Sequence, residues 1–236
     1  MTSRLLDRPR LLPLTILATA ALFAGVFTFT STTRADADQH GGHHSMSASQ
    51  PTATPATTAK ASFHDQMREL WEQHVAWTRL AIVDFASGSA GFNATAGRLM
   101  QNQVDIGDAI KPFFGDAAGD QLTSLLHDHI AIAVEVLQAA KAGDTAAFND
   151  ADARWYANAN DIADFLSAAN PRSWPDAMMR DMMKVHLDQT LAEASDELQG
   201  DYAAGVAKYD AIEAHMLAMA DDLSSGIISK FPSRFR

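Results

Sequence analysis

Apolar residues recur at helical spacing through most of the chain after residue 62. Ile130, Val134, Val136 and Leu137, for example, fall around one face of a helix. No strand-like alternation of apolar and polar residues continues for more than a few positions. Glycines and proline-containing steps separate the periodic stretches. The pattern predicts an all-α domain with helices at about 63–87, 93–111, 117–142, 145–169, 174–199 and 201–229.

Three histidines keep the same distance from three of the predicted turns. Each lies 14 residues before a glycine that breaks the periodicity: His74, His129 and His186. The residues that follow the same glycines by 14 or 15 positions are Asn102, Asn158 and His215. The matching distances predict an internal three-fold repeat in which each unit is one helical hairpin. We therefore expect a six-helix bundle built from three hairpins.

An antiparallel hairpin places residues that are equally far from its turn side by side. Fourteen residues at a rise of 1.5 Å correspond to about 21 Å, which is near mid-height in helices of this length. We therefore expect each of the three histidines to face its Asn or His partner on the returning helix. The other members of this predicted polar layer are Asp105 and Asp161, one turn beyond their asparagines, with Glu193 and Glu213 in the third hairpin.

The predicted layer has two interpretations. A buried polar group without a partner costs about 1–3 kcal/mol, so the pairs could simply satisfy one another and fix the helix register. Bundle interiors are also where helical proteins build metal and ligand sites. The sequence thus predicts either a binding protein for a transition metal or small polar ligand, or a structural or interaction module. An oxidoreductase with a bundle-held metal is a third hypothesis.

The third hairpin is the best candidate for metal ligands. It brings thioethers and imidazoles to one seam, through Met183, Met219, His186 and His215. Soft sulfur with imidazole suits copper, and Cu(I) in particular. The alternative is that methionine serves as an adaptable core filler. Iron is a second candidate cofactor. The Glu-x-x-His motif of regular di-iron sites is missing, but Glu135, Glu193 and Glu213 could supply oxygen ligands to a less regular site.

The start of the chain has the layout of a secretory signal peptide. Residues 1–37 carry a basic segment, an apolar run of about 20 residues and the small-residue site Ala35-Asp36-Ala37. We expect cleavage after Ala37 and a secreted or extracytoplasmic protein. A retained N-terminal anchor is the alternative, because about 20 apolar residues can span a bilayer.

Residues 38–61 are rich in Ser, Thr, Ala and Pro, which predicts a disordered linker before a single helical domain at 62–236. A histidine tract in this linker could trap metal, or be plain linker: His40, His43 and His44.

Charge and composition exclude several classes of function. The predicted leader holds four of the 18 basic and two of the 29 acidic residues, so the remainder has a net charge of −13. Such a chain repels phosphate backbones and anionic membranes, so we expect no nucleic-acid partner and no stable membrane embedding after cleavage. The chain has no cysteine, which excludes disulfides and thiolate chemistry. It also lacks phosphate-loop, G-x-S-x-G and His-Glu-x-x-His motifs, which argues against an enzyme.

Two basic residues of the helical domain have candidate partners nearby in the sequence. Arg79 and Lys111 could neutralise carboxylates such as Asp84 or Asp105, and solvated pairs are the commoner case.

Five stretches carry a resemblance to a known family: "LWEQHVAWTR", "LMQNQVDIGDAIKPFFG", "HIAIAVEVLQAAKAGD", "RWYANANDIADFLSAANP" and "YDAIEAHMLAMADDLSSGIISKFP". They cover nearly all of 66–232. On these motifs the chain resembles a family of uncharacterised bacterial all-helical proteins, whose members carry inconsistent enzyme labels such as glycosyltransferase. The chain has neither the α/β pattern nor the D-x-D motif of a nucleotide-sugar site. The resemblance implies one all-helical domain, with His74, His129 and His186 as motif residues.

Overall fold

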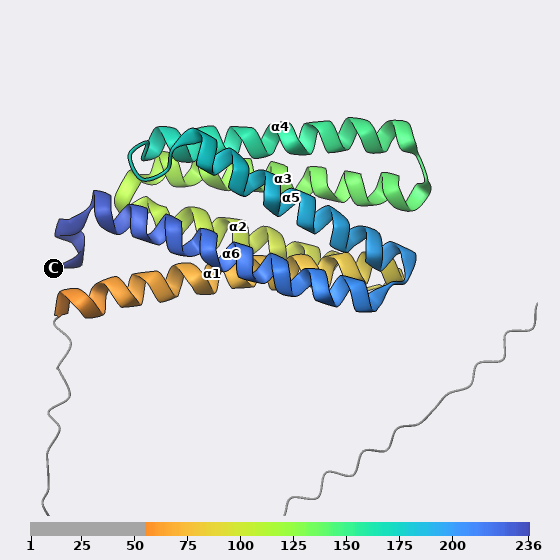
Figure 1. Ribbon diagram of the computed structural model, residues 1–236, viewed down its shortest axis with the longest axis horizontal. Helices are drawn as coiled ribbons and strands as arrows, with labels where there is room; N and C mark the ends of the chain where they lie inside the picture. The colour runs from red at the N-terminus through yellow and green to blue at the C-terminus, as the bar shows by residue number, and fades with distance from the viewer. Residues whose placement is uncertain (1–54) are drawn as a thin grey trace, which may run out of the picture. The chain divides into compact units, whose positions relative to one another are not determined.

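The computed structural model describes residues 55–236, and these belong to one compact unit of six α-helices. The helices are α1 (Pro55–Ser87), α2 (Phe92–Phe114), α3 (Asp116–Ala142), α4 (Thr145–Ala169), α5 (Asp176–Gln199) and α6 (Tyr202–Lys230), followed by the 3-10 turn η1 (Pro232–Phe235) (Figure 1). The described range contains no strand. The predicted all-α six-helix bundle is therefore confirmed. The predicted signal peptide and the linker histidines lie outside the described residues.

The first helix starts earlier than the sequence predicted. α1 begins at Pro55, within the range predicted as a linker. Proline is favoured in the first turn of a helix, and the alanines that follow are good helix formers. Ala59 in this extension packs against the core. Contact with the bundle thus explains why a segment of weak apolar character is helical.

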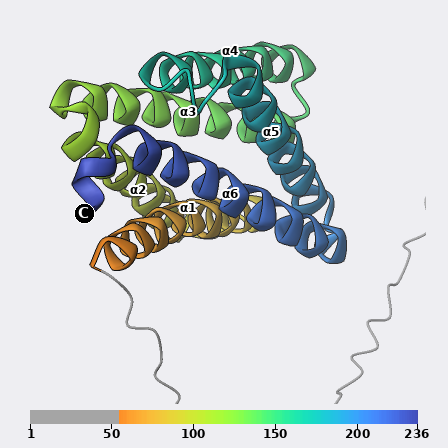
Figure 2. The same cartoon turned by 60° about the vertical axis from the view of Figure 1, so that its left-hand side comes forward.

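The six helices form a closed ring, and three of them also contact one another inside it. Each helix packs on its neighbours in chain order, and α6 closes the ring against α1. Inside the ring, α1, α3 and α5 also touch one another. Because successive helices alternate in direction, these three inner helices run in the same general direction (Figure 1). α5 crosses obliquely, from beside α4 at its start to the start of α6 (Figure 2). Inward-facing residues of α1, α3 and α5 therefore share one core.

The three hairpin turns each contain a glycine in the left-handed conformation. Gly88, Gly143 and Gly200 have φ of +70°, +69° and +78°, the left-handed conformation that glycine adopts without strain. In the second and third turns, an aspartate side chain accepts a hydrogen bond from the first turn of the next helix. These caps are Asp144 on Ala147 N at 3.0 Å and Asp201 on Ala204 N at 3.2 Å. The second and third turns, each two residues long and capped by aspartate, hold their helices in a similar register, whereas the first turn is four residues long.

α2 and α3 make their closest approach at two glycines. A Cβ atom on Gly107 would lie 2.7 Å from the carbonyl oxygen of Gly119, and one on Gly119 would lie 2.6 Å from the carbonyl oxygen of Gly107. Two helix backbones can come this near only where no side chain intervenes.

No helix of the described residues combines the length and apolar character needed to cross a bilayer.

We predict that Gly107→Ala destabilises the protein by roughly 1–3 kcal/mol, since the added methyl group must push two backbones apart. Gly97 on the same helix is exposed, and a methyl group added there would meet no atom within 4 Å. Gly97→Ala should therefore stabilise by up to about 1 kcal/mol through helix propensity. Urea unfolding of both variants measures the difference. Equal effects of the two substitutions would contradict the close crossing.

Candidate functional site

The three histidines predicted to share one level lie together at the centre of the bundle. His74 on α1, His129 on α3 and His186 on α5 are 2%, 3% and 4% exposed. The ring of His186 lies between the other two, with centroids 5.8 Å from His74 and 6.1 Å from His129. The three inner helices bring them together, because each ring occupies the same height on its own helix. We call these residues the histidine layer.

The ring of His129 has a fixed orientation. Its Nδ1 atom lies 2.8 Å from Asn158 Oδ1, which is the partner that the register predicted. Asn158 Nδ2 donates to the carbonyl oxygen of Leu125 at 3.0 Å, so the oxygen of the amide must face the imidazole. His129 therefore carries its proton on Nδ1, and its Nε2 atom has an available lone pair.

His74 interacts with Gln103 as well as with its predicted partner Asn102, and His186 contacts Thr190, which hairpin spacing did not pair with it. Gln103 Nε2 donates to the Leu99 carbonyl oxygen at 2.9 Å and lies 3.2 Å from His74 Nδ1, so the proton of His74 is on Nε2. The Thr190 hydroxyl donates to the carbonyl oxygen of His186 at 2.8 Å and lies 3.4 Å from Nδ1 of the same ring. All three rings therefore make these contacts at the same atom, Nδ1.

One hydrogen bond recurs in all three hairpins. A side-chain N–H on the returning helix donates, at 3.0 Å, to the carbonyl oxygen four residues before the layer histidine. The three pairs are Asn102 with Leu70, Asn158 with Leu125, and His215 with Met182. This contact explains why histidine can stand in the third hairpin where the others have asparagine, because both residues offer an N–H. The internal repeat itself stays a prediction.

Burial keeps the three rings uncharged. Removal from water, reinforced by the neighbouring His129, lowers the pKa of His74 to about 3. Burial lowers the pKa of His129 to about 4, with Asn158 opposing the change. Burial and the other histidines hold the pKa of His186 well below its usual range. All three are therefore neutral near pH 7, which is the form that binds a metal ion.

The layer separates two small cavities in the core. One of about 50 Å³ lies on the side of the hairpin turns, beside Thr78 and Thr190. The other, of about 30 Å³, lies on the opposite side. Both are bordered by all three histidines and otherwise almost entirely by apolar side chains. Each is large enough for a water molecule or a single ion but far below the roughly 300–1,000 Å³ of a typical organic ligand site.

A surface groove leads toward the larger of these cavities. It measures about 490 Å³ and lies between the ends of α3 and α5, near the start of α4. The residues that border both the groove and the 50 Å³ cavity are Val136, Leu137, Leu191 and Ala194. These four side chains form the wall that the groove and the cavity share.

Several residues predicted for the layer lie elsewhere. Asp105 lies toward the surface, 3.1 Å from Gln101 Nε2, and Asp161 is exposed. A three-residue step turns a helix by about 300°, so each carboxylate points about 60° away from its asparagine, and here that offset turns it toward the surface. His215 binds the Met182 carbonyl rather than His186. Glu213 is half-buried and borders neither cavity. The layer therefore contains imidazoles and amides but no carboxylate.

The remaining predicted ligands divide between the layer and a second polar cluster. Met183 and Met219 border the 30 Å³ cavity together with His186. Glu193 is buried, but it accepts a hydrogen bond from Arg79 Nη1 at 2.7 Å. Arg79 Nη2 lies 2.8 Å from Glu197 Oε1 as an ion pair without hydrogen-bond geometry. One guanidinium therefore balances two buried carboxylates, and burial raises the pKa of Glu193 while Arg79 opposes the rise.

The partners predicted for Arg79 and Lys111 were wrong. Arg79 reaches α5 instead of Asp84, and Lys111 contacts Asp108 and Asp120, each at 2.7 Å, instead of Asp105. The contact between Arg79 and α5 depends on which helices are neighbours inside the ring, and the spacing of residues does not contain that information. The spacing of Glu193 and Glu197, four residues apart, was the only local signal for a shared partner.

Comparisons with protein-family models, curated proteins and solved structures find no match for this chain. The resemblance to uncharacterised bacterial helical proteins therefore stays a prediction. Among residues 55–236, no three His, Asp or Glu side chains stand close enough to hold a metal ion without movement.

We predict that the protein loses stability as the pH falls from 6.5 to 5. The unfolded chain takes up protons near the ordinary histidine pKa of about 6.5, whereas the buried rings stay neutral until about pH 4 or below. At pH 5 each ring should cost about 2 kcal/mol, or about 6 kcal/mol for the layer. Urea unfolding from pH 7.5 to 5 tests this. His129→Gln should remove about a third of the dependence, and a flat profile in the native chain would refute it.

We predict that Arg79→Met destabilises by about 3–5 kcal/mol, because two buried carboxylates lose their counter-charge. Arg154 offers a matched control, since its ion pairs with Glu135 and Asp150 are at the surface. Arg154→Met should cost no more than about 1 kcal/mol. Adding Glu193→Gln to Arg79→Met should recover part of the loss. Denaturant titration measures all three, and equal costs for the two arginines would contradict the buried cluster.

Proposed function

We propose that this protein is an exported binder of a transition-metal ion, held by the histidine layer. The observation that carries the proposal is the convergence of three buried, neutral imidazoles from three helices. Each makes its hydrogen-bond contact at Nδ1, so Nε2 is the atom that can face an ion. Imidazole nitrogen is the commonest protein ligand of zinc, copper and related ions. Export rests on the leader-like residues 1–37.

The size of the cavities favours an ion over an organic ligand. Spaces of about 50 and 30 Å³ on either side of the layer admit a water molecule or a metal ion. A small polar organic ligand would need side chains of the core to move aside. The apolar lining also offers few hydrogen-bond partners besides the histidines. A polar molecule that entered would give up its hydrogen bonds to water without replacing them by bonds to the protein, which is unfavourable.

The contacts at Nδ1 resemble the outer partners that orient metal-bound histidines. Such histidines usually donate their second N–H to a carbonyl, carboxylate or water. His129 donates to Asn158 Oδ1 in this way. His74 must first move its proton from Nε2 to Nδ1, and Gln103 Oε1 is a buried acceptor without a partner among the described residues. Rotation of the Gln103 amide would present this oxygen to His74, at the loss of the Gln103 Nε2 hydrogen bond to the Leu99 carbonyl oxygen.

Ion binding requires a small contraction of the layer. With metal–nitrogen bonds of about 2.0–2.1 Å, two imidazoles on one ion have centroids about 5.2–5.5 Å apart. The rings of His74 and His129 now lie 5.8 and 6.1 Å from that of His186. For these two pairs a movement of about half an ångström closes the difference, and rotation of the side chains can supply it. Binding by all three rings also requires His74 and His129 to approach each other.

A structural role for the layer is the second candidate. The three equal contacts to backbone carbonyls favour it, since they would fix the register of each hairpin without any ligand. In that case the imidazoles would only fill the space where the inner helices meet. The two functions differ in whether removal of a ring abolishes ion binding.

We predict that one ion per chain binds in a manner that depends on His186. The experiment uses a background in which the N-terminal tract cannot bind metal, with the substitutions His40→Asn, His43→Asn, His44→Asn and Met46→Leu. Equilibrium dialysis against Zn(II), Co(II) and Cu(I) measures affinity and stoichiometry. His186→Gln should weaken binding by at least about 10–100-fold, the usual cost of losing even an outer partner.

His127→Gln is the matched control, because His127 lies on the same helix as His129 but binds the Met100 carbonyl. It should leave the affinity unchanged. Circular dichroism checks that each variant is folded. If none of the three ions binds in stoichiometric amount, while His186→Gln still lowers the unfolding temperature, the layer is structural.

A further inference from the structure

The two sides of the histidine layer differ in chemistry. The 30 Å³ cavity is bordered by four methionines, two from the inner helices and two from α6: Met67, Met183, Met216 and Met219. They are between 0% and 6% exposed. No methionine borders the 50 Å³ cavity on the other side. The chain has ten methionines in all, so four of them gather around one small space.

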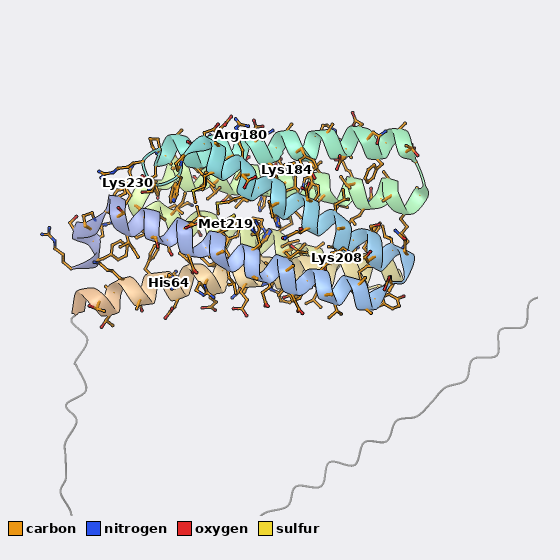
Figure 3. All side chains as sticks on the ribbon, viewed as in Figure 1. His64, Arg180, Lys184, Lys208, Met219 and Lys230 are labelled. Carbon is orange, nitrogen blue, oxygen red and sulfur yellow. The ribbon has the colours of Figure 1, made fainter. Side chains whose placement is uncertain are left out.

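The methionines approach the layer from two directions. Met67 lies two turns before His74 on α1, and Met183 lies one turn before His186 on α5, so both share the inward face of their histidine. Met216 and Met219 come from α6, which packs against both α1 and α5 and carries no layer histidine. Figure 3 shows Met219 on the middle of α6, between Lys208 and Lys230 near its ends. Thioethers thus face the layer where α6 covers it.

The absence of charged side chains from the described lining of the cavities affects which ionic charge the site favours. Neither cavity is bordered by a carboxylate within the described residues. The energy needed to bring an ion out of water grows with the square of its charge, so a divalent ion costs about four times as much as a monovalent one. Neutral imidazoles and thioethers return no charge to offset this cost. The site therefore favours a monovalent ion with soft-ligand chemistry.

We propose, resting on the metal-binding function above, that the ion is Cu(I), bound by imidazole nitrogen from the histidine layer and by thioether sulfur from the methionine-lined cavity. Thioether sulfur is a soft ligand that selects Cu(I). Methionine has three rotatable bonds in its side chain, so sulfur atoms that border the cavity can turn toward an ion without movement of the helices. Zn(II) uses only the imidazoles and binds more weakly.

The test compares Cu(I) and Zn(II) in the same background lacking the linker ligands. Cu(I) is supplied as its acetonitrile complex under argon and competed with bicinchoninate, and Ag(I) serves as a redox-inert second probe. The variant is Met183→Leu with Met219→Leu, which conserves core volume. Met179→Leu is the matched control, because Met179 is a buried methionine on the same helix that does not border the cavity.

We expect the double variant to weaken Cu(I) and Ag(I) binding by about tenfold or more and to leave Zn(II) binding unchanged. Met179→Leu should change neither. X-ray absorption of the Cu(I) form should show sulfur as well as nitrogen bound to copper, with the sulfur reduced in the double variant. Stoichiometric Zn(II) binding with Cu(I) affinity unaffected by the methionine changes would overturn this inference and leave the metal-binding proposal standing. Absence of any bound ion would overturn both.

Discussion

The structure depends on keeping three neutral imidazoles hydrogen-bonded where the inner helices meet. A ring at this depth cannot be charged and cannot leave its N–H unpaired without a cost of about 1–3 kcal/mol. The Asn158 amide accepts the Nδ1–H of His129, the Thr190 hydroxyl lies 3.4 Å from Nδ1 of His186, and Gln103 donates to Nδ1 of His74. The returning helix of each hairpin also donates to the carbonyl oxygen four residues before its histidine. Helix register, ring orientation and the position of both cavities follow from these contacts.

The placement of the histidines could be predicted from the sequence because it depends on local distances. A helix has a fixed rise, so 14 residues from a turn set the height of His129 and its partner Asn158. On the first hairpin the predicted partner Asn102 interacts with His74, but so does its neighbour Gln103, whose Nε2 atom lies 3.2 Å from His74 Nδ1. Both amides are buried, and spacing from the turn identified only one of them.

Contacts between hairpins could not be predicted in the same way. The pairing of Arg79 with Glu193 and Glu197 requires that α1 and α5 touch inside the ring, and no spacing in the sequence states which helices are inner. Asp105 and Asp161 were predicted for the layer on helical spacing alone, and they lie toward the surface, about 60° around α2 and α4 from the inward-facing Asn102 and Asn158. Among the described residues, the only buried carboxylates are those of the Arg79 cluster, Glu193 and Glu197, and the centre of the bundle is neutral.

The closed ring has a consequence for the order in which the protein assembles. Arg68 on α1 pairs with Asp221 on α6, 153 residues later, so the last helix to leave the ribosome completes the ring against the first. His186 enters on the last hairpin, and it is the ring that bridges the other two. A nascent chain that ends after α4 has His74 and His129 but lacks the imidazole between them. The centre of the bundle thus forms only after α5 has been synthesised, and a product truncated before α5 cannot contain it.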